Sequence, residues 1–141
     1  MSKAFKISGL PVVFCFALLL FLLQASMPSY GDETVIINID VAPNTLNLQS
    51  EGSVVTVHTD IAYGAVDVST VYLNDIAIHS WKADNRGNFV AKFLMEEVKL
   101  LEGLVIDGYN TLKIVGLTSD NEAFWGEQEI YVVDNVPQRQ W

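Results

Sequence analysis

Apolar and polar side chains alternate along Thr34–Val41, near the start of the polar part of the chain. Val35, Ile37, Ile39 and Val41 fall on one side of this run, and three of the four residues on the other side are polar. A period of two residues is typical of a β-strand that buries one face. The pattern predicts one half-buried strand with these four side chains directed into a core.

Short runs of the same kind recur along the rest of the chain, separated by turn-forming residues such as Asn74-Asp75. One helical signal interrupts them, Met95–Glu102, in which Val98 and Leu101 are three residues apart. The further predicted strands are Thr45–Gln49, Ser53–Thr59, Asp67–Leu73 with Ile76–Trp81 as its hairpin partner, Phe89–Phe93, Asn110–Leu117 and Ala123–Val133. We therefore expect an all-β fold, an immunoglobulin-like antiparallel β-sandwich of seven or eight strands with one short helical turn.

The first 31 residues differ in character from the rest of the chain. Lys3 and Lys6 precede an unbroken apolar run, Leu10–Leu23, and small and polar residues follow it. This order is typical of a secretory signal peptide, and the run is shorter than the roughly 20 residues of a membrane-spanning helix. Cleavage is expected after Ala25 or after Gly31, and an uncleaved anchor is the alternative. The predicted organisation is a signal peptide at 1–31 and one domain at 32–141, with a periplasmic or extracellular location.

The excess of acidic residues limits the classes of partner that the chain can bind. The 141 residues include 8 basic and 17 acidic side chains, and removal of Lys3 and Lys6 with the signal peptide deepens the net charge from -9 to -11. Such a surface disfavours nucleic acid and acidic lipids, and is compatible with cations, neutral glycans and basic protein surfaces. The single cysteine, Cys15, lies within the apolar run, so the expected mature domain has no thiol and no disulfide.

No residue pattern in the chain indicates catalysis. It contains no Gly-x-Ser-x-Gly motif and no phosphate-binding glycine loop. His58 and His79 fall within predicted strands, and no further ligands at recognisable spacing accompany them, so we expect them to face solvent. The chain is therefore predicted to be non-enzymatic, without a cofactor or a resident metal.

Two tryptophans are candidate contacts for a sugar ring. Trp81 is out of phase with Ile76 and Ile78, which predicts partial exposure, and Trp125 lies in the last predicted strand. Tryptophan presents a large apolar face suited to stacking, but it also packs commonly at the ends of a sandwich core. Both interpretations stay open at this point.

Several segments, taken in order, resemble a poorly characterised secreted bacterial β-sandwich module. The segments are Asn44–Leu48 with Ser50 and Gly52, Val54–His58, Asp67–Asn74, Val90–Phe93, Val98–Leu101 and Gly116–Val133, and the match is collinear over nearly the whole stretch from about Val35 to Val133. The resemblance implies the sandwich fold and a structural or adhesive role within exported proteins. It also implies a calcium loop, which corresponds here to Ser80–Asn88.

The sequence departs from the module at the positions of that calcium loop. Ser80, Lys82, Asp84 and Asn88 occupy ligand positions, and Asn85 replaces the glycine. Asp84 alone keeps a carboxylate among them, so we expect weak calcium binding or none, and a tight turn instead.

The leading functional hypothesis is an exported structural or protein-interaction module that binds through an exposed sheet edge or face. A carbohydrate-binding module using Trp81 or Trp125 is the alternative. A calcium-dependent adhesion unit is the third hypothesis.

Overall fold

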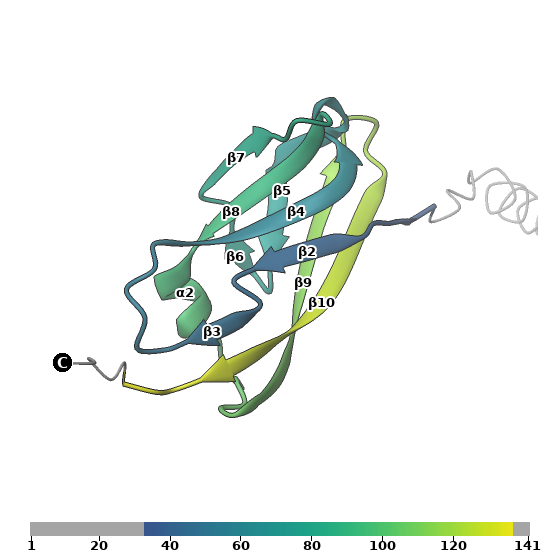
Figure 1. Ribbon diagram of the computed structural model, residues 1–141. Coiled ribbons are helices and arrows are strands. Elements are labelled where there is room, and N and C mark those ends of the chain that lie inside the picture. Colours follow the sequence, from purple (N-terminus) through teal and green to yellow (C-terminus); the bar gives the residue numbers. More distant parts are fainter. Residues whose placement is uncertain (1–32, 137–141) are drawn as a thin grey trace, which may run out of the picture. The chain divides into compact units, whose positions relative to one another are not determined.

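The computed structural model describes residues 33–136 and folds them into two β-sheets packed face to face (Figure 1). The six-stranded sheet contains β1 (Val35–Ile36), β3 (Thr45–Asn47), β5 (Val66–Leu73), β6 (Ile76–Ala77), β9 (Gly108–Thr118) and β10 (Ala123–Val133). The four-stranded sheet contains β2 (Ile39–Ala42), β4 (Val54–Ala62), β7 (Ser80–Ala83) and β8 (Asn88–Leu94), and a 3-10 turn, η1 (Tyr63–Ala65), and a helix, α2 (Met95–Lys99), complete the fold. The predicted all-β sandwich is confirmed. The predicted signal peptide, its two cleavage points and Cys15 lie outside the described residues.

The six-stranded sheet has the order β1-β10-β9-β5-β6, with β3 also paired to β10. Both β1 and β3 run parallel to β10, whereas the remaining pairs in the two sheets are antiparallel. The four-stranded sheet has the order β2-β4-β8-β7. The segment that leads from β1 through β2 to β3 therefore visits the first sheet, the second sheet and the first sheet again.

The prediction of one continuous strand over Thr34–Val41 is wrong, because the chain changes sheet at Asn38. The carboxylate of Asp60 accepts hydrogen bonds from the backbone N–H of Asn38 at 2.9 Å and from its side-chain Nδ2 at 2.7 Å. These bonds provide acceptors for the N–H groups of Asn38 at the point where the chain stops pairing with β10 and begins to pair with β4. Ile37 and Val41 are buried as predicted, but Val35 is exposed.

The prediction of one strand over Ile76–Trp81 is wrong for a similar reason. Ile76–Ala77 pairs with β5, and the chain then crosses so that Ser80–Ala83 pairs with β8 in the other sheet. At the crossing, the N–H of Ile78 donates to the carbonyl of Val71 at 3.3 Å, and the N–H of His79 donates to the carbonyl of Lys92 at 2.9 Å. These two breaks raise the number of strands among residues 33–136 above the seven or eight expected.

The core lies between the inner faces of the two sheets. Its fully buried side chains are mainly aliphatic, with three phenylalanines: Val41, Leu46, Val55, Val57, Val71, Leu73, Phe89, Ala91, Phe93, Val98, Leu112, Ile114, Phe124, Ile130 and Val132. Gly126 allows the first of the crossing segments to pass closely over β10, because a Cβ at that position would lie 2.6 Å from the carbonyl oxygen of Ile37. A side chain there would push the two strands apart.

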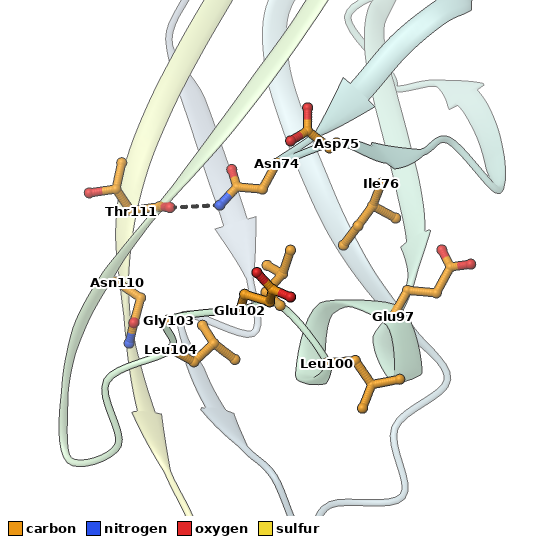
Figure 2. Close-up of a pocket in the computed structure, with 11 residues that line it drawn as sticks. Asn74, Asp75, Ile76, Glu97, Leu100, Glu102, Gly103, Leu104, Asn110 and Thr111 are labelled. Carbon is orange, nitrogen blue, oxygen red and sulfur yellow. Dashed lines mark hydrogen bonds between the residues drawn. The ribbon is translucent and has the colours of Figure 1, made fainter.

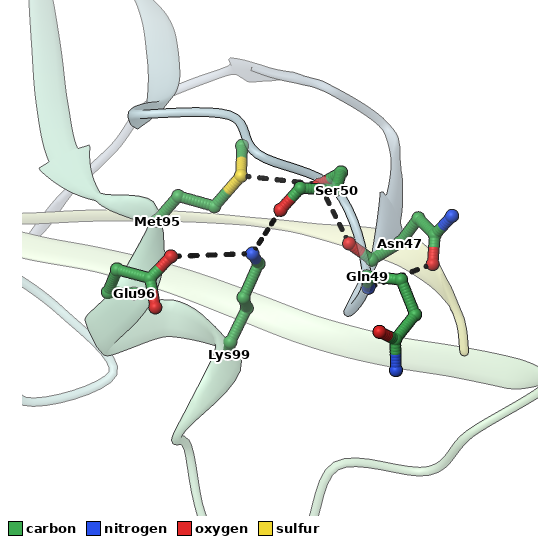
Figure 3. Close-up of polar contacts among 6 residues, drawn as sticks. All are labelled: Asn47, Gln49, Ser50, Met95, Glu96 and Lys99. Carbon is green, nitrogen blue, oxygen red and sulfur yellow. Dashed lines mark hydrogen bonds and ion pairs between the residues drawn. The ribbon is translucent and has the colours of Figure 1, made fainter. Parts of the chain in front are cut away.

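The helix α2 closes one end of the sandwich and is shorter than the predicted Met95–Glu102. Its Lys99 side chain, only 12% exposed, donates to the carbonyl of Ser50 at 2.5 Å and pairs with Glu96 at 3.4 Å (Figure 3). The Ser50 hydroxyl donates to the Asn47 carbonyl at 2.7 Å and lies 3.7 Å from the Met95 sulfur. These contacts attach the helix to the connection between β3 and β4. No helix among residues 33–136 has the length and apolar character needed to cross a membrane.

Candidate functional site

The outer face of the six-stranded sheet carries a line of apolar side chains that crosses five strands. We call it the apolar row: Ile36 of β1, Trp125 of β10, Val115 of β9, Tyr72 of β5 and Ala77 of β6. Each is the direct cross-strand partner of the next, and such partners have side chains on the same face of a sheet. The row is open to solvent, with Ile36 70%, Tyr72 42% and Val115 38% exposed.

Strand alternation places these side chains outside the core. Along β10, Phe124 and Gly126 are buried, so Trp125 between them faces outward and is half-buried. Along β9, Ile114 is fully buried and Val115 next to it is exposed. An outer face would ordinarily carry polar residues at these positions, so the apolar row is a departure from the expected pattern.

Charged residues lie directly beside the row. Lys113 of β9 is paired in register with Glu127 of β10, one position further along the outer face than the pair Val115 and Trp125. The ammonium group of Lys113 lies 4.5 Å from the centroid of the Trp125 ring. A cation at this distance from an indole face is attracted by the ring's negative potential. The outer face thus has an apolar centre and a charged border.

The two tryptophans singled out from the sequence lie on different sheets. Trp81 is on the edge strand β7 and is paired in register with Ala91, a core residue, so its side chain is on the inner face of that sheet, where it is 44% exposed. The predicted partial exposure of Trp81 is confirmed, but its predicted phase relative to Ile76 and Ile78 does not hold across the sheet crossing. Trp125 instead shares its surface with Tyr72. The structure therefore does not join Trp81 and Trp125 in one aromatic platform.

The two histidines are exposed and lie apart from the apolar row. His58 is on β4, where it is paired with Asp40 and Val90 in the four-stranded sheet. His79 lies in the crossing between β6 and β7 rather than within a strand. Within residues 33–136, no group of three or more His, Cys, Asp or Glu side chains is placed to hold a metal ion.

The segment that resembles a calcium loop forms a β-hairpin between β7 and β8. Ser80 and Lys82 belong to β7, so the predicted loop over Ser80–Asn88 is too long, and the turn begins at Asp84. Oδ1 of Asp84 accepts hydrogen bonds from the backbone N–H groups of Arg86 at 2.8 Å and Asn88 at 2.9 Å. The hydrogen bond from Asn88 is the main reason that the pKa of Asp84 is below its ordinary value of 3.8, and its effect is larger than the opposing effect of desolvation. The hydrogen bond from Arg86 and the charges of Arg86 and His58 lower this pKa further. The carboxylate of Asp84 thus organises the tight turn.

A cavity of about 580 Å³ opens at the end of the sandwich that α2 covers, and sequence reasoning did not find it (Figure 2). Its wall comes from three segments: the β5–β6 turn, the helix with the loop that follows it, and the start of β9. The lining residues are Asn74, Asp75, Ile76, Glu97, Leu100, Leu101, Glu102, Gly103, Leu104, Asn110 and Thr111. The only signals in the sequence were the turn residues at 74–75 and the glycine at 103, which do not reveal that the segments meet.

The chain was compared with protein-family models, with curated proteins and with solved structures. The chain matches no protein-family model, and it has no significant match among curated proteins or among solved structures. The resemblance to a secreted β-sandwich module accordingly stays a prediction.

Proposed function

We propose that this protein is an exported, non-enzymatic interaction module that binds a partner protein through the apolar row. The observation that carries the proposal is the continuity of the row across five strands of one sheet face. Isolated exposed apolar residues are common on protein surfaces, whereas contiguous ones mark interaction sites.

The chemistry of the row supports a protein partner over other classes. Trp and Tyr at the centre of a face, with aliphatic neighbours and a charged border, correspond to the usual composition of protein–protein hot spots. Lys113 and Glu127 border the row with opposite charges, so a partner can be oriented by charge as well as held by apolar contact. Export is part of the proposal and rests on the predicted signal peptide at residues 1–31.

A neutral glycan is the second candidate ligand of the same face. Trp125 and Tyr72 are two strand spacings apart, about 9–10 Å between backbones, which is comparable with the length of two linked sugar rings. Sugar stacking, however, needs an open indole face, and the ammonium group of Lys113 lies over that of Trp125. The contact therefore favours the protein partner.

The calcium-dependent adhesion unit draws less support than either. The carboxylate of Asp84 is the one acidic group of the resembling segment, and its Oδ1 is already engaged by two backbone N–H groups of the turn. Calcium sites need several oxygen ligands around one position.

The proposal is tested by comparing Trp125→Ala with Trp81→Ala in binding to proteins exported by the same cells. Both changes remove a tryptophan from a strand, but only the first disrupts the apolar row. We expect a bound protein that is lost with Trp125→Ala and retained with Trp81→Ala. Affinity gel electrophoresis in neutral glycans provides the second arm, and retardation there that depends on Trp125, without a protein partner, would assign the face to a glycan.

A further inference from the structure

We infer that the cavity beside α2 is a second binding site, which takes an arginine side chain presented by a partner protein. The inference extends the proposed function from the outer sheet face to one end of the sandwich. Its support is independent of the apolar row and comes from the walls of the cavity, its charge and its size.

The walls of the cavity are held in place by hydrogen bonds across separate segments. Asn74 donates from Nδ2 to the carbonyl of Thr111 at 3.0 Å and accepts at Oδ1 from the N–H of Lys113 at 2.7 Å, as Figure 2 shows for the first of these bonds. Asn110 accepts at Oδ1 from the N–H of Val105 at 2.7 Å and returns a bond to its carbonyl at 2.9 Å. The β5–β6 turn and the loop before β9 are thus both attached to β9, so the cavity is formed before any ligand arrives.

Apolar side chains line part of the cavity. Ile76, Leu101 and Leu104 are half-buried and pack against the main core, so they provide a fixed apolar surface. Leu100 at the helix end is 82% exposed and lies at the open side. A ligand with an aliphatic stem gains contact here that a bare inorganic cation would not.

The charge of the cavity is negative and lacks a basic partner in the lining. Asp75, Glu97 and Glu102 are the acidic residues of the lining, and no Lys, Arg or His is among the lining residues. Two lysines are close in sequence to the lining, but each is engaged elsewhere. Lys99 binds Ser50 and Glu96, and Lys113 lies over Trp125. The carboxylates therefore attract a cation from outside.

These features together fit an arginine side chain. The three carboxylates do not form a cluster placed to hold a metal ion. A planar guanidinium has five N–H donors and can donate hydrogen bonds to oxygens that lie apart from one another. The volume of about 580 Å³ is within the range of sites that hold small organic ligands. The aliphatic stem of arginine matches the apolar wall, and its guanidinium matches the acidic rim.

The test is an NMR titration of the full chain, as isolated from cells that express it, with Nα-acetyl-arginine methylamide. Nα-acetyl-citrulline methylamide, which has the same shape without the charge, is the matched ligand control. We expect saturable chemical-shift changes of the amides of Gly103 and Thr111. The arginine compound should bind at least about fivefold tighter than the citrulline compound, because several partly exposed ion pairs each add a modest binding free energy. Equal binding of the two compounds, or no saturable shift at these amides, would overturn the inference.

A double variant locates the charge effect. Glu97→Gln with Glu102→Gln should abolish the preference for arginine over citrulline. Glu51→Gln with Glu122→Gln makes the same change in net charge at exposed positions outside the cavity, and it should keep the preference. If both double variants lost the preference for the arginine compound, the preference would depend on the overall charge of the protein and not on the cavity, which would contradict the inference. If the first double variant fails to fold, the comparison of the two ligands on the unmodified protein still tests the inference.

A further arm separates a partner's side chain from a free cation. Tighter binding of 1,4-diaminobutane than of the arginine compound at these amides would assign the cavity to a free polyamine and overturn the inference. Binding at the cavity does not involve the apolar row, so Ile36→Ala, which alters the row and leaves Lys113 over Trp125, should leave the titration unchanged. Failure of the titration and failure of the proposed function are therefore distinguishable.

Discussion

The ammonium group of Lys113 lies 4.5 Å from the ring centroid of Trp125, on the open face of the six-stranded sheet. The lysine comes from β9 and the tryptophan from β10, and the backbone partner of Lys113 is Glu127 rather than Trp125. The contact is thus diagonal across two strands, and it places a positive charge over the largest aromatic side chain of the apolar row. It gives that face the mixed character of a protein contact surface.

The first prediction concerns this contact. Lys113→Ala should lower the free energy of unfolding by about 0.5–1 kcal/mol, the usual value of an exposed cation–π pair. Lys82→Ala, a change of the same kind at an exposed position of β7, should change it less. Urea unfolding of the two variants measures the difference. Equal losses in both would show that the contact contributes no stability.

The second prediction concerns the close approach at Gly126. Gly126→Ala should destabilise the domain by about 1–3 kcal/mol, because its Cβ would meet the carbonyl oxygen of Ile37 at 2.6 Å and the backbone would have to move. Gly64→Ala is the control, since a Cβ there would meet nothing within 4 Å. Its effect should stay within about 0.5 kcal/mol. Thermal melts that rank the two variants in the opposite order would contradict the crossing described here.

The third prediction is a dependence on pH at the β7–β8 turn. The folded pKa of Asp84 is below 3.8, chiefly because the N–H of Asn88 binds its carboxylate, so ionised Asp84 stabilises the fold. That stabilisation is present above pH 3.8 and is lost as the pH falls through the lower, folded pKa. Asp84→Asn should therefore melt below the unmodified protein at neutral pH, and the gap should close in acid.

Asp120→Asn is the control for this effect. Asp120 lies in the exposed β9–β10 turn, so Asp120→Asn removes one carboxylate at an exposed position. Its variant removes the same charge, so an effect of overall charge on the melting temperature should appear in it as well. A gap for Asp84→Asn that stays constant down to pH 2 would contradict the role of the charge.

How much of this could be predicted from the sequence depends on the distance between interacting residues. Alternation predicted that Ile37 and Val41 face the core, because that pattern is local, and both are buried. It did not reveal the change of sheet at Asn38, because the alternation continues through it. The cause is Asp60, which is 22 residues away in the sequence.

The candidate surfaces were harder to predict for the same reason. The apolar row depends on the parallel pairing of Ile36 with Trp125 and on the order of five strands. The local phase of Trp125 shows only that it faces outward. The cavity joins the turn at Asn74 to the loop at Gly103, and no local pattern links these segments.

The fourth prediction concerns export. When the full chain is expressed with its own N-terminal segment in a bacterial host, the protein should be recovered outside the cytoplasm and should begin at Ser26 or Asp32. Intact-mass measurement distinguishes the two, because they differ by six residues. A product that retains Lys3 and Lys6 would indicate the uncleaved anchor instead.

The central claim, that a partner protein docks on the apolar row, is tested most directly by site-specific photo-crosslinking in the cells that make this protein. A photoreactive amino acid replaces Val115 within the row or, as the control, His58 on the exposed face of the other sheet. We predict a defined protein adduct from position 115 that disappears with Trp125→Ala and persists with Trp81→Ala, and none from position 58. The absence of a protein adduct at position 115, or the same adducts from both positions, would contradict the account.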